Sequence, residues 1–478
     1  MDKDNHEHRQ NRFAVIQTAK KLNSNREYSG KGVTVAFLDS GFYPHPDYSD
    51  RVKKFHDVSG EEKEFGELEK PQGFHWHGTQ TVVACAGDGT LSDGFYSGIA
   101  SQAELVLVKV SENGGRIPDS NIEKGLRWVI KNCEEYGIKI VNMSLGGDQD
   151  LRTKDSKINQ LAEKLVKKGV SITVAAGNSA ESHSIPPASS PSVITVGGYS
   201  DENSKEAGDF DLYHSGFGKT ADSLIKPEII APAMFVAAPI LPDTEEYAAA
   251  KILSWVNNAP DYKINSVLFE HWHQAKLPER IMYQHDKNVV REMIDAEIQK
   301  RKLVSTHYQS VDGTSFSAPI VASVIAQLLE ANPDLTPTVI KNILVSTATK
   351  LAGQPGIRQG YGIVNASLAV KRSLSENHFF DEKEFRPPFI FGNKIVFSYH
   401  DDSAETVDLI GEFNNWKAGE NEFTKCKDGI WRAKIPCQPI HFCKYKFLVN
   451  GKKWTEDPSH GFKENDGYGG FNSILNIF

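Results

Sequence analysis

The sequence predicts an α/β fold with a largely parallel sheet between helices, followed by a smaller all-β domain. Between residues 33 and 198, short runs that are apolar on both faces alternate with amphipathic helical patterns, which is typical of buried parallel strands joined by helices. A polar, helical stretch interrupts this alternation from about Ile240 to Ser305. Beyond Ser375 the helical patterns give way to aromatic alternation and glycine turns, as in antiparallel sheets.

Five predicted strands account for the parallel sheet. They are VTVAFLD (33–39), ELVLVKV (104–110), IKIVNMSL (138–145), VSITVAAGN (170–178) and PSVITVGG (191–198). Helices are predicted over 119–137 and 150–169. The second has an apolar stripe that includes Ile158 and Leu161, and Gly169 ends it. In a sheet of this kind, catalytic groups gather at the carboxyl ends of the strands.

The acidic, proline-bearing segment ENHFFDEKEFRPP (376–388) is predicted to be a linker. We therefore divide the chain into residues 1–385, which contain the helical insertion, and residues 386–478. The second part is predicted to be all-β from the runs KIVFSYH, VDLIGEFNNW, GIWRAKIP and CKYKFLVNGKKW.

Composition narrows the class of protein. The 478 residues carry 54 basic and 62 acidic side chains, a net charge of −8, without a dense basic stripe, which argues against nucleic-acid binding. No apolar run approaches the ~18 residues of a membrane span, and the polar N-terminus has no signal-peptide core. The cysteines are odd in number and lack metal-type spacing, so we expect reduced thiols in a cytoplasmic protein: Cys85, Cys133, Cys426, Cys437 and Cys443.

Four polar residues follow predicted strand ends or open predicted helices. Asp39 ends the first strand, and His77 precedes a glycine and an apolar helix start. Asn178 follows a glycine after the fourth strand, and Ser315 lies in GTSFSAP before a long apolar helix. Each alone has a structural explanation as a loop cap, an isolated histidine, a turn residue or a helix cap. Together they supply the carboxylate, imidazole, amide and hydroxyl that nucleophilic acyl transfer requires.

The order Asp, His, Ser is the order found in subtilisin. With VAFLDSG, HGTQ, VNMSLGG, AAGNS and GTSFSAP in sequence, the chain resembles the subtilisin-like serine peptidases from about Gly30 to Ala366. The resemblance implies a subtilisin-like α/β domain with endopeptidase activity on proteins or peptides. It also implies roles for four residues: Ser315 as nucleophile, His77 as general base, Asp39 as the carboxylate that orients it, and Asn178 as a donor to the oxyanion.

GTSFSAP contains two serines. If the helix begins near Ser315, then Ser317 lies about 200° round its axis at ~100° per residue. Ser315 keeps the exposed side at the mouth of the helix, so we choose it as the nucleophile. Pro319 is expected in the first turn, where backbone amides have no helical acceptor.

The resemblance further implies segments that bind substrate as an added strand: Ser144, Leu145, Gly146 and Gly147 on one side of a cleft, and Gly114 and Gly115 on the other. Simple turns stay an alternative for both glycine pairs. Gln80, Glu228 and Ala233 replace the residues usual in the family, at positions that do not carry the chemistry.

The long insertion at 240–305 could form a lid, a partner surface or an oligomer contact. Calcium is common in the family, but the sequence defines no ligand set, so we assign no metal or other cofactor. Met1 lies within 40 residues of the first catalytic strand. We expect neither a signal nor an inhibitory propeptide, and therefore another means of restraining a cytoplasmic protease.

The C-terminal part, from about Phe391 to Phe478, resembles the glycogen-binding, early-set modules of immunoglobulin-like fold found on glycogen-branching enzymes. The positions that contact sugar in that family fall on Trp416, Lys446, Trp454 and Asn472, so the resemblance implies α-glucan binding. Two alternatives stay open: the tryptophans serve the sandwich core, or the module docks a protein. A catalytically silent glycogen-associated scaffold is the alternative for the whole chain.

Overall fold

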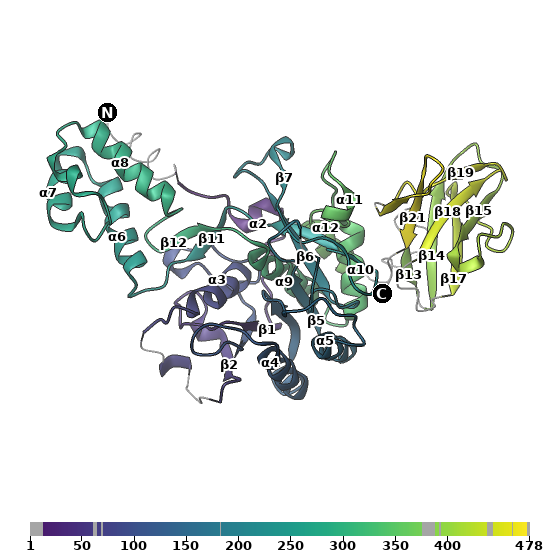
Figure 1. Cartoon of the computed structure of the whole chain (residues 1–478), viewed down its shortest axis with the longest axis horizontal. Coiled ribbons are helices and arrows are strands. Elements are labelled where there is room, and N and C mark those ends of the chain that lie inside the picture. The colour runs from purple at the N-terminus through teal and green to yellow at the C-terminus, as the bar shows by residue number, and fades with distance from the viewer. Residues whose placement is uncertain are drawn as a thin grey trace.

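The computed structural model describes residues 13–60, 65–67, 70–181, 183–374, 388–391, 393–436, 443–460 and 462–475. An α/β domain lies at the centre of the molecule, with a helical insertion on one side and a β-sandwich on the other (Figure 1). The predicted linker, apart from Pro388, and Cys437 lie outside the described residues.

The predicted parallel sheet is confirmed. Its strands are ordered β10-β6-β5-β4-β1-β3-β2, all parallel to their neighbours, and the short β7 pairs antiparallel with β6. The strands are β1 (Thr34–Asp39), β2 (Val52–Asp57), β3 (Glu104–Lys109), β4 (Ile138–Met143), β5 (Ser171–Ala175), β6 (Ile194–Ser200), β7 (Asp211–Leu212) and β10 (Ile229–Pro232). In register, Asp39 lies opposite Lys109 at the carboxyl edge of the sheet.

Helices cover both faces of this sheet, and each face has its own apolar core. Side chains such as Phe37 and Leu107 pack with α3 and α9, whereas Leu38 and Val108 pack with α4 and α5. The helices of this domain are α2 (Thr18–Lys21), α3 (His75–Ala86), α4 (Asp119–Asn132), α5 (Lys157–Lys167), α9 (Thr314–Ala331), α10 (Pro337–Thr347), α11 (Gly356–Gln359) and α12 (Ala366–Leu374). A small hairpin of β8 (Gly218–Lys219) and β9 (Ile225–Lys226) completes the domain.

The central helix α9 corrects two expectations. By length and composition it is apolar enough to span a membrane, contrary to the sequence prediction, but 83% of its 18 residues are buried inside the fold, as in a core helix. It begins at Thr314, so Pro319 is its sixth residue and lies beyond the first turn. The missing amide of Pro319 therefore removes the helical donor to the carbonyl of Ser315.

The insertion between β11 (Val236–Pro239) and β12 (Tyr308–Val311) contains α6 (Glu245–Asn258), α7 (Asp261–His271) and α8 (Lys287–Lys300). These helices enclose a separate apolar core that includes Leu253, Leu268 and Ile294. The insertion is thus a small helical unit on a two-stranded stem, and β12 leads from it directly towards α9 (Figure 1).

The C-terminal part is all-β, as predicted. One sheet has the order β13-β14-β17-β16, and the other has the order β15-β18-β21-β20 with β19 beside β18. All pairs are antiparallel, and side chains such as Phe397 and Phe447 fill the space between the sheets. The strands are β13 (Phe389–Phe391), β14 (Lys394–His400), β15 (Val407–Gly411), β16 (Thr424–Lys425), β17 (Ile430–Pro436), β18 (Cys443–Val449), β19 (Lys453–Thr455), β20 (Lys463–Asn465) and β21 (Phe471–Leu475).

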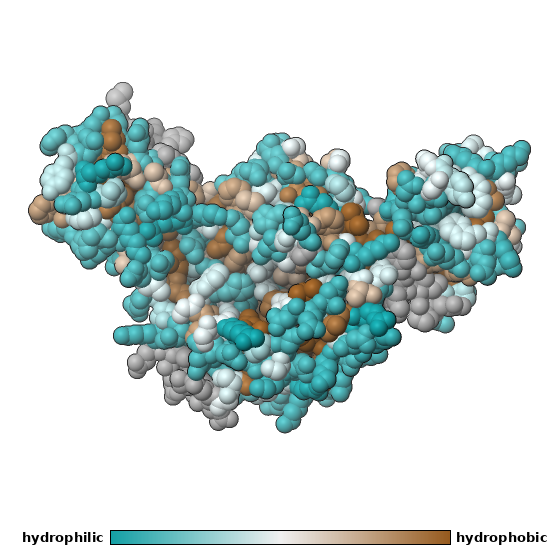
Figure 2. Space-filling view, viewed as in Figure 1, coloured by the Kyte–Doolittle hydropathy of each residue, from teal (hydrophilic) through white to brown (hydrophobic). Residues whose placement is uncertain are grey.

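The sandwich is packed firmly on the α/β domain. Phe462 and Ile474 of the sandwich belong to the same apolar cluster as α9 and its neighbours. Tyr361 of the α/β domain stacks on His460 at 5.6 Å between ring centroids and meets Phe462 edge-on at 5.0 Å. Figure 2 shows hydrophilic residues over most of the visible face, with apolar residues gathered on the central domain and beside this junction. The two domains therefore share a buried contact, in addition to the chain that joins them.

Candidate active site

Asp39 and His77 form a hydrogen-bonded pair at the carboxyl edge of the sheet. Asp39 ends β1 and is 1% exposed, and His77 lies in the first turn of α3. Nδ1 of His77 is 2.7 Å from Oδ1 of Asp39. Since a carboxylate only accepts, Nδ1 carries the hydrogen and Nε2 is left as the basic nitrogen. The hydroxyl of Thr81, one turn further along α3, shares its hydrogen between Oδ2 of Asp39 at 3.1 Å and the carbonyl of Gly78 at 2.9 Å.

The pKa of His77 reflects two opposing effects. Burial lowers this pKa, because it penalises the charged imidazolium. The negative charge of Asp39 and its hydrogen bond act in the other direction and together outweigh burial, so the pKa of His77 is raised above its ordinary value. The pair therefore stabilises a proton on the imidazole.

Ser315 and Ser317 occupy different environments. Ser315 is partly exposed at the mouth of α9, whereas Ser317 is fully buried. The hydroxyl of Ser317 donates to the carbonyls of Ala231 and Pro232, at 3.3 and 3.0 Å. The ring of Phe316, the residue after Ser315, lies 6.2 Å from the ring of His77. Of the two serines, only Ser315 is accessible to solvent, and the residue that follows it contacts His77.

The loop before Ser315 brings Asn178 alongside. Oδ1 of Asn178 accepts from the backbone amide and the hydroxyl of Thr314, at 2.9 and 3.0 Å. These bonds orient the side-chain amide and leave Nδ2 to donate elsewhere. Gly313 has φ +130°, and a Cβ there would lie 3.4 Å from Nδ2 of Asn178. The glycine therefore keeps the space beside this donor open.

A row of hydrogen bonds ties the backbone of Ser315 to the sheet. Thr173 on β5 donates to Asn142 on β4 at 3.1 Å, and Asn142 donates to the hydroxyl of Ser144 at 3.1 Å. The hydroxyl of Ser144 donates in turn to the carbonyl of Ser315 at 2.7 Å. This carbonyl is the one that Pro319 leaves without a helical donor, so Ser144 satisfies it.

A cleft of about 700 Å³ leads to this site. It is lined by Ser40, Gln72, Gly73, Phe74, Trp76, His77, Asn113, Gly114, Gly115, Ile117, Ser144, Leu145 and Gly146. Five of the six predicted substrate-binding residues thus border one cleft together with His77. Gly147 is not among the lining residues, and its amide donates to the carbonyl of Pro186 at 2.7 Å.

Sequence reasoning missed the two aromatic residues of the cleft. Phe74 and Trp76 flank His75 just before His77, and Trp76 is 48% exposed. The nitrogen of Lys109 lies 5.2 Å from the ring centre of Phe74 and pairs with Asp57 at 2.7 Å. The string GFHWHG could have indicated them, since aromatic residues one and three positions before a candidate base are expected to lie near it in the cleft.

Two of the residues that depart from the family pattern, Gln80 and Glu228, have polar partners in the structure. Gln80 is buried in α3 and donates to the carbonyl of Pro239 at 2.9 Å. Glu228 is fully buried and pairs with Lys226 and Lys341, at 2.6 and 2.8 Å. Burial is the main effect that lowers the pKa of Lys341, to about 7. Lys226, Glu228 and Lys341 thus form an internal ion cluster, and none of the three lines the cleft.

Among the described residues, no group of three or more His, Cys, Asp or Glu side chains could hold a metal ion, so no calcium ligands are assigned. The four cysteines in this part of the chain, Cys85, Cys133, Cys426 and Cys443, are free thiols.

The predicted sugar-contacting residues lie on or beside one sheet of the sandwich, β15-β18-β21-β20. Trp454 pairs with Leu448 of β18, which is on the same face as Lys446. Continuing the register of β18 and β21 places Asn472 opposite Lys446. Trp416 follows β15 at the other side of β18, and the two tryptophans are 37% and 49% exposed. Neither tryptophan belongs to the sandwich core, which excludes that alternative.

Lys446 is held in position by an ion pair with Asp466 in the turn between β20 and β21. The hydrogen bond from Lys446 is the largest effect that lowers the pKa of Asp466, to about 2. Since an ammonium has three hydrogens, Lys446 keeps donors for a ligand while its direction is fixed.

Two family models match the chain. The subtilase family model matches residues 30–364. The model of carbohydrate-binding module 48, the isoamylase N-terminal domain, matches residues 384–463.

Individual relatives agree with the first match. Serine protease AprX of Bacillus subtilis (strain 168) is 30% identical over 373 residues, which are 75% of this chain and 72% of that protein. Subtilisin-like protease 1 of Trichophyton rubrum is 34% identical over 185 residues, 37% of this chain and one third (33%) of that protein. The crystal structure of a cold adapted subtilisin-like serine proteinase has 20% identity and a TM-score of 0.45, covering 71% of this chain and 89% of that one. The chain therefore belongs to the subtilase family and is a subtilisin-like serine endopeptidase.

Proposed function

We propose that the endopeptidase cleaves peptide bonds with Ser315 as nucleophile and His77 as general base. Oγ of Ser315 attacks the substrate carbonyl carbon while its proton passes to Nε2 of His77. The imidazolium is stabilised by Asp39, and the oxyanion receives hydrogen bonds from Nδ2 of Asn178 and the amide of Ser315 at the helix start. His77 then returns the proton to the leaving amine, and water hydrolyses the acyl-enzyme in the same way.

The observation that carries this proposal is the 2.7 Å bond between His77 and Asp39 beside a helix mouth where only one of two serines is accessible. Labelling with a fluorophosphonate probe tests it. We expect labelling and proteolysis in the wild type and in Ser317→Ala, and neither in Ser315→Ala. A folded Ser315→Ala chain that still reacts with the probe would refute the assignment. An unreactive wild type would favour the silent scaffold.

We propose in addition that the sandwich binds α-glucan through Trp416, Lys446, Trp454 and Asn472. Exposed indole faces can stack on the apolar faces of sugar rings, and a fixed ammonium and an amide can bond hydroxyls. Repeated sites on a polymer raise the effective concentration, so glycogen should bind more tightly than a short oligosaccharide.

Cosedimentation of the full-length Ser315→Ala chain with glycogen tests this second proposal. Use of the full chain avoids exposing Phe462 and Ile474, which an isolated sandwich would present to water. The Ser315→Ala chain with an unaltered sandwich is expected to pellet with glycogen. The same chain with Trp416→Ala/Trp454→Ala is expected to stay in the supernatant. Trp255→Ala/Tyr262→Ala, which removes exposed aromatic residues of the insertion, is the matched control. Equal pelleting of all variants would leave a protein-docking module as the better account.

A further inference from the structure

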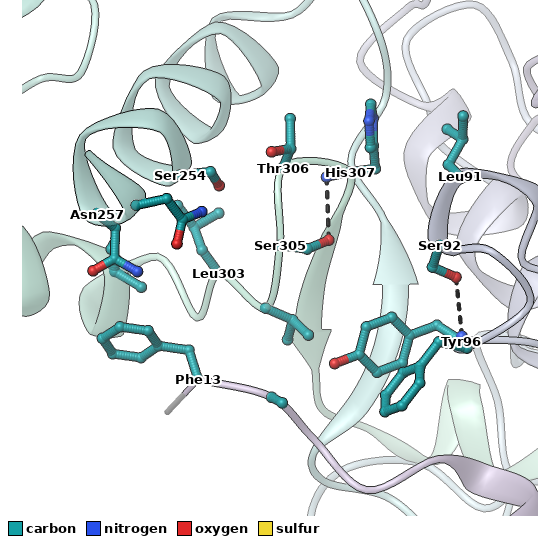
Figure 3. Close-up of a pocket in the computed structure, with 15 residues that line it drawn as sticks. Phe13, Leu91, Ser92, Tyr96, Ser254, Asn257, Leu303, Ser305, Thr306 and His307 are labelled. Atoms are coloured by element: carbon teal, nitrogen blue, oxygen red, sulfur yellow. Dashed lines mark hydrogen bonds between the residues drawn. The ribbon is translucent and has the colours of Figure 1, made fainter. Parts of the chain in front are cut away.

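A second cavity lies where the helical insertion meets the α/β domain (Figure 3). Its volume of about 430 Å³ lies within the range of small-molecule sites, roughly 300–1,000 Å³. It shares no lining residue with the catalytic cleft. Its walls come from Phe13 and Ala14, from residues between 91 and 96, from α6, from Ile298 of α8, and from residues 303–307.

The cavity is uncharged. Its lining contains no Asp, Glu, Lys or Arg side chain among the residues that the structure describes. Burial is the largest effect on the pKa of His307 and lowers it; Lys251 lowers it further and Asp47 opposes both. His307 is therefore neutral at pH 7. A charged ligand would find no opposite charge in the lining, so the geometry favours a neutral one.

The walls of the cavity are amphipathic. In Figure 3 the side chains of Ser254 and Asn257 from α6 and of Thr306 lie towards one side of the cavity, and the rings of Phe13 and Tyr96 lie towards the other. In the described part of the chain, no hydrogen bond engages the side chains of Ser254, Asn257 or Thr306. These groups both donate and accept, which suits hydroxyls that do the same.

A sugar ring has this distribution of chemistry, with apolar faces and a rim of hydroxyls. We propose that the cavity binds a short neutral oligosaccharide as an effector of the peptidase. The choice of sugar over another neutral amphipathic ligand rests on the proposed glucan-binding function of the sandwich.

The cavity is connected to the nucleophile by the stem of the insertion. Residues 303–307 continue into β12, which ends at Val311, four residues before Ser315. The carbonyl of His307, just before β12 begins, accepts from the amide of Ile240, just after β11 ends, at 2.9 Å. The other stem strand, β11, ends at Pro239, to whose carbonyl Gln80 of α3 donates. A ligand that contacts both α6 and Thr306 would hold the stem strands β11 and β12 against the α/β domain. Because β12 leads to Ser315, we expect such a ligand to raise the kcat of the peptidase.

Binding is tested with maltotriose on the full Ser315→Ala chain that also carries Trp416→Ala and Trp454→Ala, which removes the proposed sandwich site. We expect saturable binding by calorimetry, weakened at least tenfold by Asn257→Leu/Thr306→Val. The same types of substitution in α7, Asn265→Leu/Ser266→Val, outside the cavity lining, should leave affinity unchanged. Thermal unfolding checks that each variant is folded.

Loss of all maltotriose binding on removal of Trp416 and Trp454 would overturn the proposal, as would equal binding by the Asn257→Leu/Thr306→Val variant. Binding of a capped neutral tripeptide in place of maltotriose would refute the ligand class. With Ser315 restored, saturating maltotriose should raise kcat on a short peptide at least twofold, and an unchanged kcat would refute the effector role. Failure of glycogen to pellet the chain concerns only the sandwich, so the two proposals fail separately.

Discussion

The pair of Asp39 and His77 shows burial and charge opposing each other at a single imidazole. His77 is partly enclosed by α3 and Phe316, yet its pKa is raised because the neighbouring carboxylate outweighs the penalty of burial. Asn178 is also oriented by its neighbours, because its Oδ1 accepts two hydrogen bonds from Thr314 and its Nδ2 is thereby directed elsewhere. The proposed roles of His77 and Asn178 therefore depend on Asp39 and Thr314, which do not themselves react with the substrate.

The first prediction concerns Asn178→Ala. We expect kcat to fall by ~10²–10³ with little change in KM, because an oxyanion donor acts mainly in the transition state. Steady-state kinetics on one peptide substrate measure both constants. A rise in KM at unchanged kcat would mean that Asn178 binds the ground state.

The second prediction is a pH dependence. His77 must be neutral to accept a proton, and its pKa is raised, so kcat/KM should fall as pH decreases through a value above 6.5. In Asp39→Asn the charge that raises the pKa is lost while burial is kept, so the residual activity should fall at a lower pH. A pH–rate profile of both chains checks this, and coincident acid limbs would contradict it.

The sequence defined the candidate catalytic residues more clearly than the residues that surround them. Asp39, His77, Asn178 and Ser315 lie in glycine-flanked strings whose residue types are restricted by chemistry. Trp76 was missed because its place in the cleft depends on how distant parts of the chain fold together. Proximity of this kind leaves no local pattern in the sequence.

Among the elements, strands and helices were predicted where burial controls the residue pattern. β2 was missed because its side chains are largely exposed or half-buried, so VKKFHD has no apolar run. α5 was predicted from residue 150 but begins at Lys157, where the hydroxyl of Ser156 accepts from the amide of Asn159 at 3.2 Å. The predicted strand over 170–178 stops at Ala175, since Gly177 has φ +94° and turns the chain. Such boundaries depend on single capping bonds and turns.

The third prediction concerns the start of α9. Gly313 has φ +130° and ψ +153°, a region that is essentially restricted to glycine. We expect Gly313→Ala to displace the loop and lower kcat/KM at least a hundredfold. Gly60→Ala is the matched control, because Gly60 also has positive φ (+90°) and no atom of the described residues lies within 4 Å of an added Cβ. Equal activity of the two variants would contradict the expected strain at the nucleophile loop.

At the scale of the whole molecule, the sandwich packs directly against the α/β domain. Tyr361 accounts for much of this contact, since its ring meets both His460 and Phe462 and its amide donates to the carbonyl of Glu228 at 2.8 Å. Lys219 also lies 3.6 Å from Glu464, which pairs with Asn472 across β20 and β21. The sequence suggested a linker and two separate functions. The contact depends on long-range packing, which composition does not record.

The fourth prediction tests this contact. Phe462 is 1% exposed, so Phe462→Ala should cost about 3–5 kcal/mol of unfolding free energy. Part of this loss should appear as heat inactivation of the peptidase at a lower temperature. Phe471→Ala, in the same module but 46% exposed, is the control and should change little. Peptidase heat stability that is equal in both variants would show that the domains unfold independently.

The bond from Ser144 to the carbonyl of Ser315 has a consequence for substrate selection. A hydroxyl has a single hydrogen, and in Ser144 this hydrogen points to the enzyme's own nucleophile segment. A peptide bound along this side of the cleft, as proposed for the substrate, therefore cannot receive that hydrogen. Pro319 thus removes a side-chain donor from the cleft, because the carbonyl that lost its helical donor to the proline takes the hydrogen of Ser144 instead.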